Sequence, residues 1–230
     1  MTTRTRTRTR TITATFASVV ASVAAVLGLG GLSAQAATTY GCPLSGSTVC
    51  TSPLAGTVHG DVTVTGDGYG FNLSGNGTPG YVAVDNSNQI SMGSFPVSFS
   101  AQVKGVGVPS SQVGDYDVVR GTPNGNWKLE VVARNSRTTA RASCFFKGPS
   151  GKGAATGGPD LTTLQAVWTT ITCTNTGAAI ELRVNGTLVK TETVATGPIP
   201  NPGPLLLGAK NTAGGDQFSG SAKDVQVSVP

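Results

Sequence analysis

The feature that most constrains this chain is an alternation of apolar and polar residues with a period of two. Residues 97–103 alternate Val, Phe, Ala and Val with Ser, Ser and Gln, and residues 127–133 repeat the pattern. A period of two places successive side chains on opposite faces of a strand, so each segment predicts a strand with one buried face. Residues 140–146, 167–173 and 225–229 follow the same pattern.

Turn signals separate these segments, and no stretch after residue 36 has a helical period. Asn185-Gly186 lies between two apolar runs and predicts a hairpin, because both residues tolerate the positive φ of a type I′ turn. A single helical turn is expected between Leu161 and Trp168, with Asp160 as its N-cap. About ten to twelve short strands with glycine-rich turns predict an all-β fold, a two-sheet antiparallel β-sandwich.

The N-terminus has the order of a secretory signal. Four arginines lie between residues 4 and 10, a mostly apolar run follows over residues 12–32, and Ala34-Gln35-Ala36 supplies the small-x-small pattern of a cleavage site. The alternative is an uncleaved membrane anchor, since about 20 apolar residues can span a bilayer. The glycines at 28–31 weaken a helix there, so we interpret residues 1–36 as a signal peptide and predict a secreted, extracellular protein without membrane attachment after cleavage.

Removal of residues 1–36 changes the charge of the chain. Because four of its 16 basic residues lie in that segment, residues 37–230 carry 12 basic against 11 acidic residues. Nucleic-acid binding needs a clustered basic surface and is therefore not expected. Scarce lysine with abundant Ala, Gly, Thr and Val is typical of a bacterial protein from a GC-rich genome.

All four cysteines follow the predicted signal peptide, and an even number in an exported chain predicts two disulfides. Four cysteines allow three connectivities. The short spacing favours Cys42–Cys50, which leaves Cys144–Cys173, both in the apolar phase of predicted strands. Residues 37–59, rich in Thr, Ser, Pro and Gly, are expected to be an irregular segment pinned by the first disulfide. A cysteine metal site is not favoured, because no Cys-x-x-Cys occurs.

The second half of the chain resembles a known family through an ordered set of motifs. These are Gly121–Val132, Cys144-Phe145-Phe146, Trp168–Cys173, Ile180–Gly186, Leu207–Lys210 and Asp216–Gly220 before Asp224-Val225. Over residues 60–230 the chain resembles a LamG-like (laminin G-type) domain of the concanavalin A-like lectin/glucanase superfamily. The resemblance implies a jelly-roll sandwich and says much less about function.

The resemblance also bears on calcium. Relatives often have two adjacent acids in the last strand, where an acid can help to hold calcium, whereas this chain has Lys223-Asp224. A calcium ion is therefore not expected at the terminal strand, and no other cofactor is predicted. Asp115, Asp117 and Asp216 are expected in polar loops, where solvated acids are commoner than ion ligands.

Residues for catalysis are scarce. Glycosidase relatives of this fold place several carboxylates close together on one strand, in a Glu-x-Asp-x-x-Glu pattern, and no such pattern occurs here. Glu130 and Glu181 each lie alone, opposite the apolar phase, and are expected to be solvated. The single histidine, His59, precedes a glycine, and no Gly-x-Ser-x-Gly motif accompanies it. No catalytic residue is predicted, and the protein is not expected to be an enzyme.

The two tryptophans differ in phase. Trp127 shares the apolar phase with Leu129 and is expected in the core. Trp168 lies opposite its apolar neighbours and is the one candidate ligand-binding residue, as a platform that stacks on a sugar ring, although it could equally cover the other face of a sheet. The leading hypothesis is a secreted, non-catalytic module that binds carbohydrate or another cell-surface ligand. The alternatives are a glycoside hydrolase on the same fold and a structural cell-envelope protein.

Overall fold

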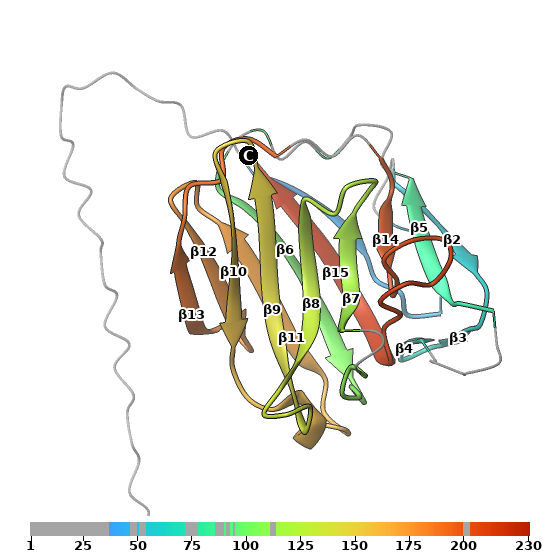
Figure 1. Ribbon diagram of the computed structural model, residues 1–230. Coiled ribbons are helices and arrows are strands. Elements are labelled where there is room, and N and C mark those ends of the chain that lie inside the picture. Colours follow the sequence, from blue (N-terminus) through green and yellow to red (C-terminus); the bar gives the residue numbers. More distant parts are fainter. Residues whose placement is uncertain are drawn as a thin grey trace, which may run out of the picture. The chain divides into compact units, whose positions relative to one another are not determined.

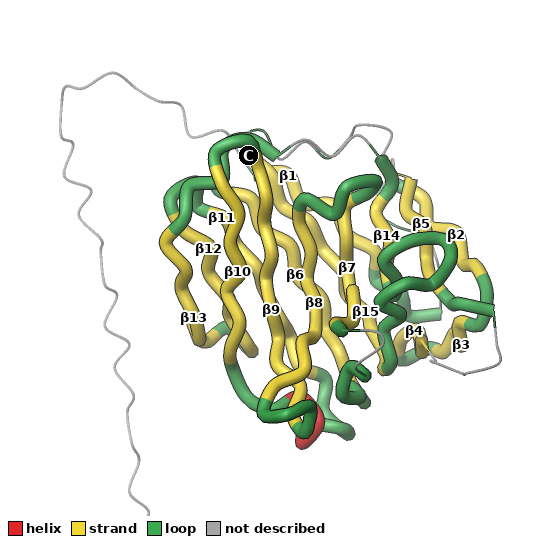
Figure 2. The backbone as a smooth tube through the Cα atoms, in the orientation of Figure 1, coloured by secondary structure: helices red, strands yellow, loops and turns green. Residues whose placement is uncertain are grey.

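The structure is a computed structural model that describes most of the chain after residue 36. The described residues are 37–46, 50, 54–71, 78–85, 90, 93, 95–110, 114–199 and 203–230. The predicted signal peptide lies outside them. Within them the chain forms fifteen strands and one short 3₁₀ helix, η1 (Leu161–Thr163). Figure 2 shows this part as strands and loops with a single helical turn.

Two antiparallel sheets pack face to face, as Figure 1 shows. The eight-stranded sheet has the order β13-β12-β11-β6-β15-β4-β3, and β1 also pairs with β15. Its strands are β13 (Thr187–Thr193), β12 (Ala179–Val184), β11 (Thr169–Asn175), β6 (Val97–Lys104), β15 (Gly220–Val229), β4 (Gly68–Phe71), β3 (Val62–Thr65) and β1 (Thr38–Cys42).

The seven-stranded sheet has the order β10-β9-β8-β7-β14-β5-β2. Its strands are β10 (Gly151–Gly157), β9 (Thr139–Gly148), β8 (Trp127–Arg134), β7 (Asp115–Gly121), β14 (Leu205–Leu207), β5 (Tyr81–Asp85) and β2 (Ala55–His59). The all-β sandwich predicted from the alternating pattern is confirmed.

The core lies between the inner faces of the two sheets. Along β6 every second residue is buried, which is the predicted phase. Phe99 from β6 packs against Trp127 and Phe146 of the other sheet, with ring centroids 4.8 and 5.2 Å apart. Trp127 is fully buried, as expected. Burying an aromatic side chain of this kind contributes about 1.5–3 kcal/mol, so these rings are a main source of cohesion between the sheets.

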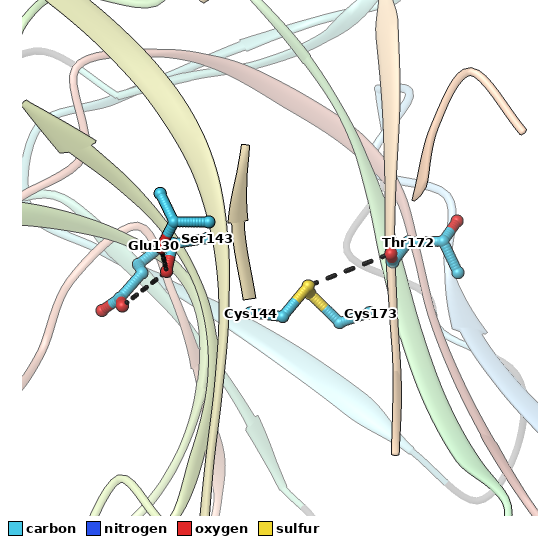
Figure 3. The surroundings of a disulfide bond; sticks show 6 residues. Glu130, Ser143, Cys144, Thr172 and Cys173 are labelled. Atoms are coloured by element: carbon cyan, nitrogen blue, oxygen red, sulfur yellow. Dashed lines mark hydrogen bonds between the residues drawn. A yellow bond between two sulfur atoms is a disulfide. The ribbon is translucent and has the colours of Figure 1, made fainter. Parts of the chain in front are cut away.

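Both predicted disulfides are present. Cys144 on β9 and Cys173 on β11 join one sheet to the other through the core, with Cα atoms 5.4 Å apart. Figure 3 shows this bond between the strands, with Ser143, the residue before Cys144, on the opposite side of its strand. The second bond joins Cys42 to Cys50.

The local turn predictions are also confirmed. Asn185 and Gly186 have φ values of 49° and 79° and connect β12 to β13. Asp160 caps η1, because its side chain accepts a hydrogen bond from the Thr162 amide. Among the described residues, no helix has the length and apolar character needed to cross a membrane.

The expectation of an irregular segment over residues 37–59 is wrong. The segment contains β1, which pairs with the last strand, and β2, which pairs with β5. Both strands lie at sheet margins and expose much of their surface. Because their side chains bury little, the sequence lacks the apolar alternation that marks an interior strand.

Candidate functional site

The candidate site lies on the outer face of the seven-stranded sheet, the face turned away from the core. Strand register aligns one residue from each strand into a single row across this face. From β10 to β2 the row is Ala154, Phe145, Lys128, Arg120, Leu206, Ala83 and Thr57. The row places two cations, Lys128 and Arg120, between the apolar residues Phe145 and Leu206.

A row of polar residues runs beside it on the same face. Thr156, Ser143, Glu130 and Asp117 are cross-strand partners on β10, β9, β8 and β7. The Thr156 hydroxyl donates to the Ser143 oxygen at 2.9 Å, and the Ser143 hydroxyl donates to a Glu130 carboxylate oxygen at 3.1 Å, as Figure 3 shows for the second bond. Three strands are therefore linked by side-chain hydrogen bonds on this face.

The two rows meet in a buried charge cluster, by which we mean Asp115, Asp117, Arg120, Lys128 and Glu130. Local sequence explains its geometry. Asp115 and Asp117 are two residues apart on β7, and Lys128 and Glu130 are two apart on β8, so each pair projects from the same face. Asp117 is fully buried, and Arg120 and Glu130 are nearly so.

Lys128 is the centre of this cluster. Its ammonium nitrogen lies 2.7 Å from an Asp115 oxygen and 3.4 Å from an Asp117 oxygen, and it also contacts the Glu130 carboxylate. Arg120 completes the pairing with an Nη1–Oδ2 distance of 2.7 Å to Asp117. The expectation that Glu130 is solvated is wrong, because its carboxylate is buried between these groups.

Burial changes the acidity of these groups. It raises the pKa of Glu130 to about 7, and the neighbouring Asp115 adds to this effect while Lys128 opposes it. Burial also acts to raise the pKa of Asp115, but hydrogen bonds from Glu130 and Lys128 outweigh it and hold that pKa below its usual value. Three carboxylates against two cations leave one excess negative charge, which protonation of Glu130 removes.

The carboxylates of Asp115, Asp117 and Glu130 could also hold a metal ion, since one ligand oxygen from each lies within 4.8 Å of the others. In this structure the Lys128 ammonium lies among them and makes an ion pair with each. The expectation that Asp115 and Asp117 lie in polar loops is wrong, because both are on β7. Asp216 does lie in a loop, where it pairs with Lys210 at 2.9 Å.

A pocket of about 230 Å³ opens at the same face. It is lined by Thr122, Pro123, Pro204, Leu206, Lys210, Asn211 and Thr212. Leu206 belongs to a small apolar cluster with Tyr81 and Ala209. The Asn211 side-chain oxygen accepts hydrogen bonds from the Ala213 and Gly215 amides and so fixes the wall of the pocket.

Trp168, the candidate from the sequence, lies apart from this face. It precedes β11 of the eight-stranded sheet, and the ammonium groups of Lys104 and Lys223 lie 4.5 and 4.3 Å from its ring centroid. Its indole nitrogen donates to Asp67, which also binds both lysines. These three donors hold the pKa of the Asp67 carboxyl well below its usual range, with the two lysines contributing most. A role for Trp168 in stacking on sugars stays a prediction.

The remaining candidates lie elsewhere. His59 stacks on Tyr81 with ring centroids 4.7 Å apart, and Glu181 pairs with Arg183 on β12. The charge cluster was missed in the sequence, although a signal was present: Asp-x-Asp and Lys-x-Glu are each spaced to share one face of a strand.

The fold is an antiparallel sandwich of two sheets, with a pocket on the outer face of one of them. The model of the concanavalin A-like lectin/glucanases superfamily matches residues 58–228, so the chain belongs to that family through its laminin G-type branch. No curated protein sequence matches the chain.

Several solved structures of similar fold are binding domains of botulinum neurotoxins. The botulinum neurotoxin serotype G binding domain matches with a TM-score of 0.59 and 14% identity, over 82% of this chain and 46% of that one. A structure for botulinum neurotoxin type C, whose cell entry depends on interaction with two ganglioside molecules, has a TM-score of 0.57 and 17% identity, over 78% and 44%. The binding domain of Paraclostridial Mosquitocidal Protein 1 has 0.53 and 15%, over 75% and 44%. The chain spans less than half the length of these structures, and identities this low indicate the shared fold alone.

Proposed function

We propose that this protein is a secreted, non-catalytic module that binds carbohydrate through the outer face of the seven-stranded sheet. The observation that carries the proposal is the pocket at Leu206. It is lined by the apolar residues Pro123, Pro204 and Leu206 and by the polar residues Lys210, Asn211 and Thr212. Sugars present both apolar ring faces and hydroxyl groups, so a concave site of mixed character suits them.

The solved structures of similar fold also support a role in binding carbohydrate. Two of them are described as binding domains, and cell entry of the type C toxin depends on interaction with two ganglioside molecules, which are glycolipids. Secretion is supported by the order of residues 4–36 and by the two disulfides, since such bonds persist in oxidising compartments.

A glycoside hydrolase is the second candidate, and the charge cluster is the observation that favours it. A retaining glycosidase needs two carboxyl groups about 5–5.5 Å apart, one with a raised pKa. Glu130 has such a pKa. However, Asp117 is fully buried, and Lys128 already pairs with all three carboxylates. A substrate would have to displace that ammonium, so we favour binding.

The test is a glycan array with purified protein of residues 37–230, followed by calorimetry on any glycan bound. Thr212→Trp places a large side chain in the pocket and is expected to abolish binding. Thr191→Trp adds the same side chain at an exposed position of β13 and should bind normally.

Two further readouts separate the alternatives. Trp168→Ala should leave binding intact; loss of binding in that variant alone would move the site to the eight-stranded sheet. Release of reducing sugar from a bound glycan, lost in Glu130→Gln, would establish the hydrolase. The absence of binding to any glycan on the array would favour a structural role in the cell envelope.

A further inference from the structure

The segment over residues 131–159 has an unusual charge. It contains five basic residues and no acidic residue. It contains all of β9 and β10, together with the end of β8. All eleven acidic residues of the chain lie among the described residues, and none of them forms an ion pair with this segment. The positive charge of the segment is therefore largely uncompensated within the described part of the chain.

Strand register places most of this charge on one face. β9 buries Ala142, Cys144 and Phe146 in the core, so the residues between them project from the outer face. We call the four cations on this face the basic strip. They are Arg134 on β8, Arg141 and Lys147 on β9, and Lys152 on β10.

Lys147 and Lys152 are the least compensated members of the basic strip. They are direct cross-strand partners, both are exposed, and neither forms an ion pair with a described residue. Like charges in this position oppose strand pairing. By contrast, Arg141 donates to the Gly158 carbonyl and lies near Asp160, whose pKa it helps to lower. A bound anion would relieve the repulsion at the lysine pair.

An aromatic ring lies within the strip. Phe145 is two residues from Lys147 on the same face of β9, is half-buried, and has exposed Ala154 as its cross-strand partner. Arg141 and Lys147 are separated by six residues, which corresponds to about 20 Å along a strand. The face thus offers cations at both ends of an extended track and an apolar ring between them.

Resting on the proposed function, we infer that the basic strip binds an acidic polysaccharide laid along β9. Its sulfate or carboxylate groups pair with Lys147 and Lys152, and a sugar ring lies against Phe145. Ammonium groups bind such anions through charge-assisted hydrogen bonds. The ring contact and the linear spacing favour a sugar polymer over an isolated anion.

The experiment compares dextran sulfate with neutral dextran, which have the same backbone, against residues 37–230. Polygalacturonate serves as a carboxylate ligand. We expect binding to both acidic polymers that weakens several-fold between 50 and 300 mM NaCl, because salt screens exposed charges. Lys147→Gln with Lys152→Gln should weaken it about tenfold or more, since two charged hydrogen bonds are lost. Lys147→Arg with Lys152→Arg keeps the charge and should retain binding, and Arg183→Gln on the other sheet should change little.

Three other results of this experiment would contradict the basic strip, the choice of ligand or the proposed function. Equal binding of dextran and dextran sulfate, unchanged in the glutamine variant, would overturn the basic strip while supporting carbohydrate recognition. Binding of double-stranded DNA or phosphatidylserine vesicles as tight as that of dextran sulfate, with the same lysine dependence, would overturn the choice of a polysaccharide. Failure to bind any glycan, neutral or acidic, would overturn the proposed function as well.

Discussion

At the scale of single residues, the charge cluster is the most consequential feature of the molecule. Lys128 is an internal counter-ion for three carboxylates that would otherwise repel one another on one sheet face. Breaking a buried ion pair by removing one partner costs far more than an exposed pair contributes, because the remaining charge has lost its hydration. Two predictions follow from the positions of Glu130 and Lys128.

Glu130 should make the protein less stable as the pH rises. Its pKa is about 7 in the folded state against 4.5 in the unfolded chain, so the folded state binds more protons between these values. The associated stability is fully present below pH 4.5 and is lost as the pH rises through 7. The free energy of unfolding should fall by roughly 2–3 kcal/mol over this range. Urea titrations from pH 4.5 to 8 measure it, and Glu130→Gln should flatten the profile; an unchanged slope in that variant would assign the effect to another group.

Lys128→Met should destabilise the fold by about 3–5 kcal/mol, because three carboxylates lose their shared cation. It should also open the cluster to a divalent cation, so that calcium raises the melting temperature of the variant. Wild type should respond little to calcium or EDTA, given Lys128 in the cluster and Lys223 beside Asp224. Lys152→Met, at an exposed position that forms no ion pair with any described residue, is the matched control and should cost less than about 0.5 kcal/mol. A large drop in the wild-type melting temperature on EDTA treatment would contradict this interpretation.

At the scale of strands, interior elements were predictable and marginal ones were not. β6 and β9 lie between two neighbours and bury alternate residues, so their sequences carry the period of two. β1 and β2 bury little and carry no such signal. The site was missed for a related reason. The alternation shows which side chains point away from the core, but it does not show whether such a side chain contacts water or another residue on the outer face. Glu130 contacts Ser143 on the neighbouring strand and Lys128 on its own strand.

The disulfides should differ in their effect on stability. In the chain-entropy treatment, the bond between Cys144 and Cys173, 29 residues apart, is worth roughly 3–4 kcal/mol, and the shorter Cys42–Cys50 loop roughly 2–3 kcal/mol. The longer bond also joins the two sheets through the core. Denaturant unfolding of the paired alanine variants should therefore show the larger loss for Cys144→Ala with Cys173→Ala. Equal losses would mean that loop length does not dominate here.

At the scale of the whole molecule, secretion is predicted from residues 1–36, which lie outside the described part of the chain. If Ala34-Gln35-Ala36 is the processing site, N-terminal sequencing of protein recovered from the culture medium should begin at Ala37. Protein retained on membranes with the arginine-threonine segment intact would instead support the uncleaved anchor.

The pairing of β1 with β15 has a mechanical consequence. Thr38 lies opposite Val229, so the first and last strands bring both ends of the sandwich to one place. If the module were held by both ends under load, the force would act across the ladder between these two antiparallel strands. Its hydrogen bonds would then open one after another, as in a zipper, rather than resist together as they do in shear. The Cys42–Cys50 bond lies at the far end of β1, which this stepwise separation of the strands would reach last. The bond would then limit the extension of the chain between the two cysteines.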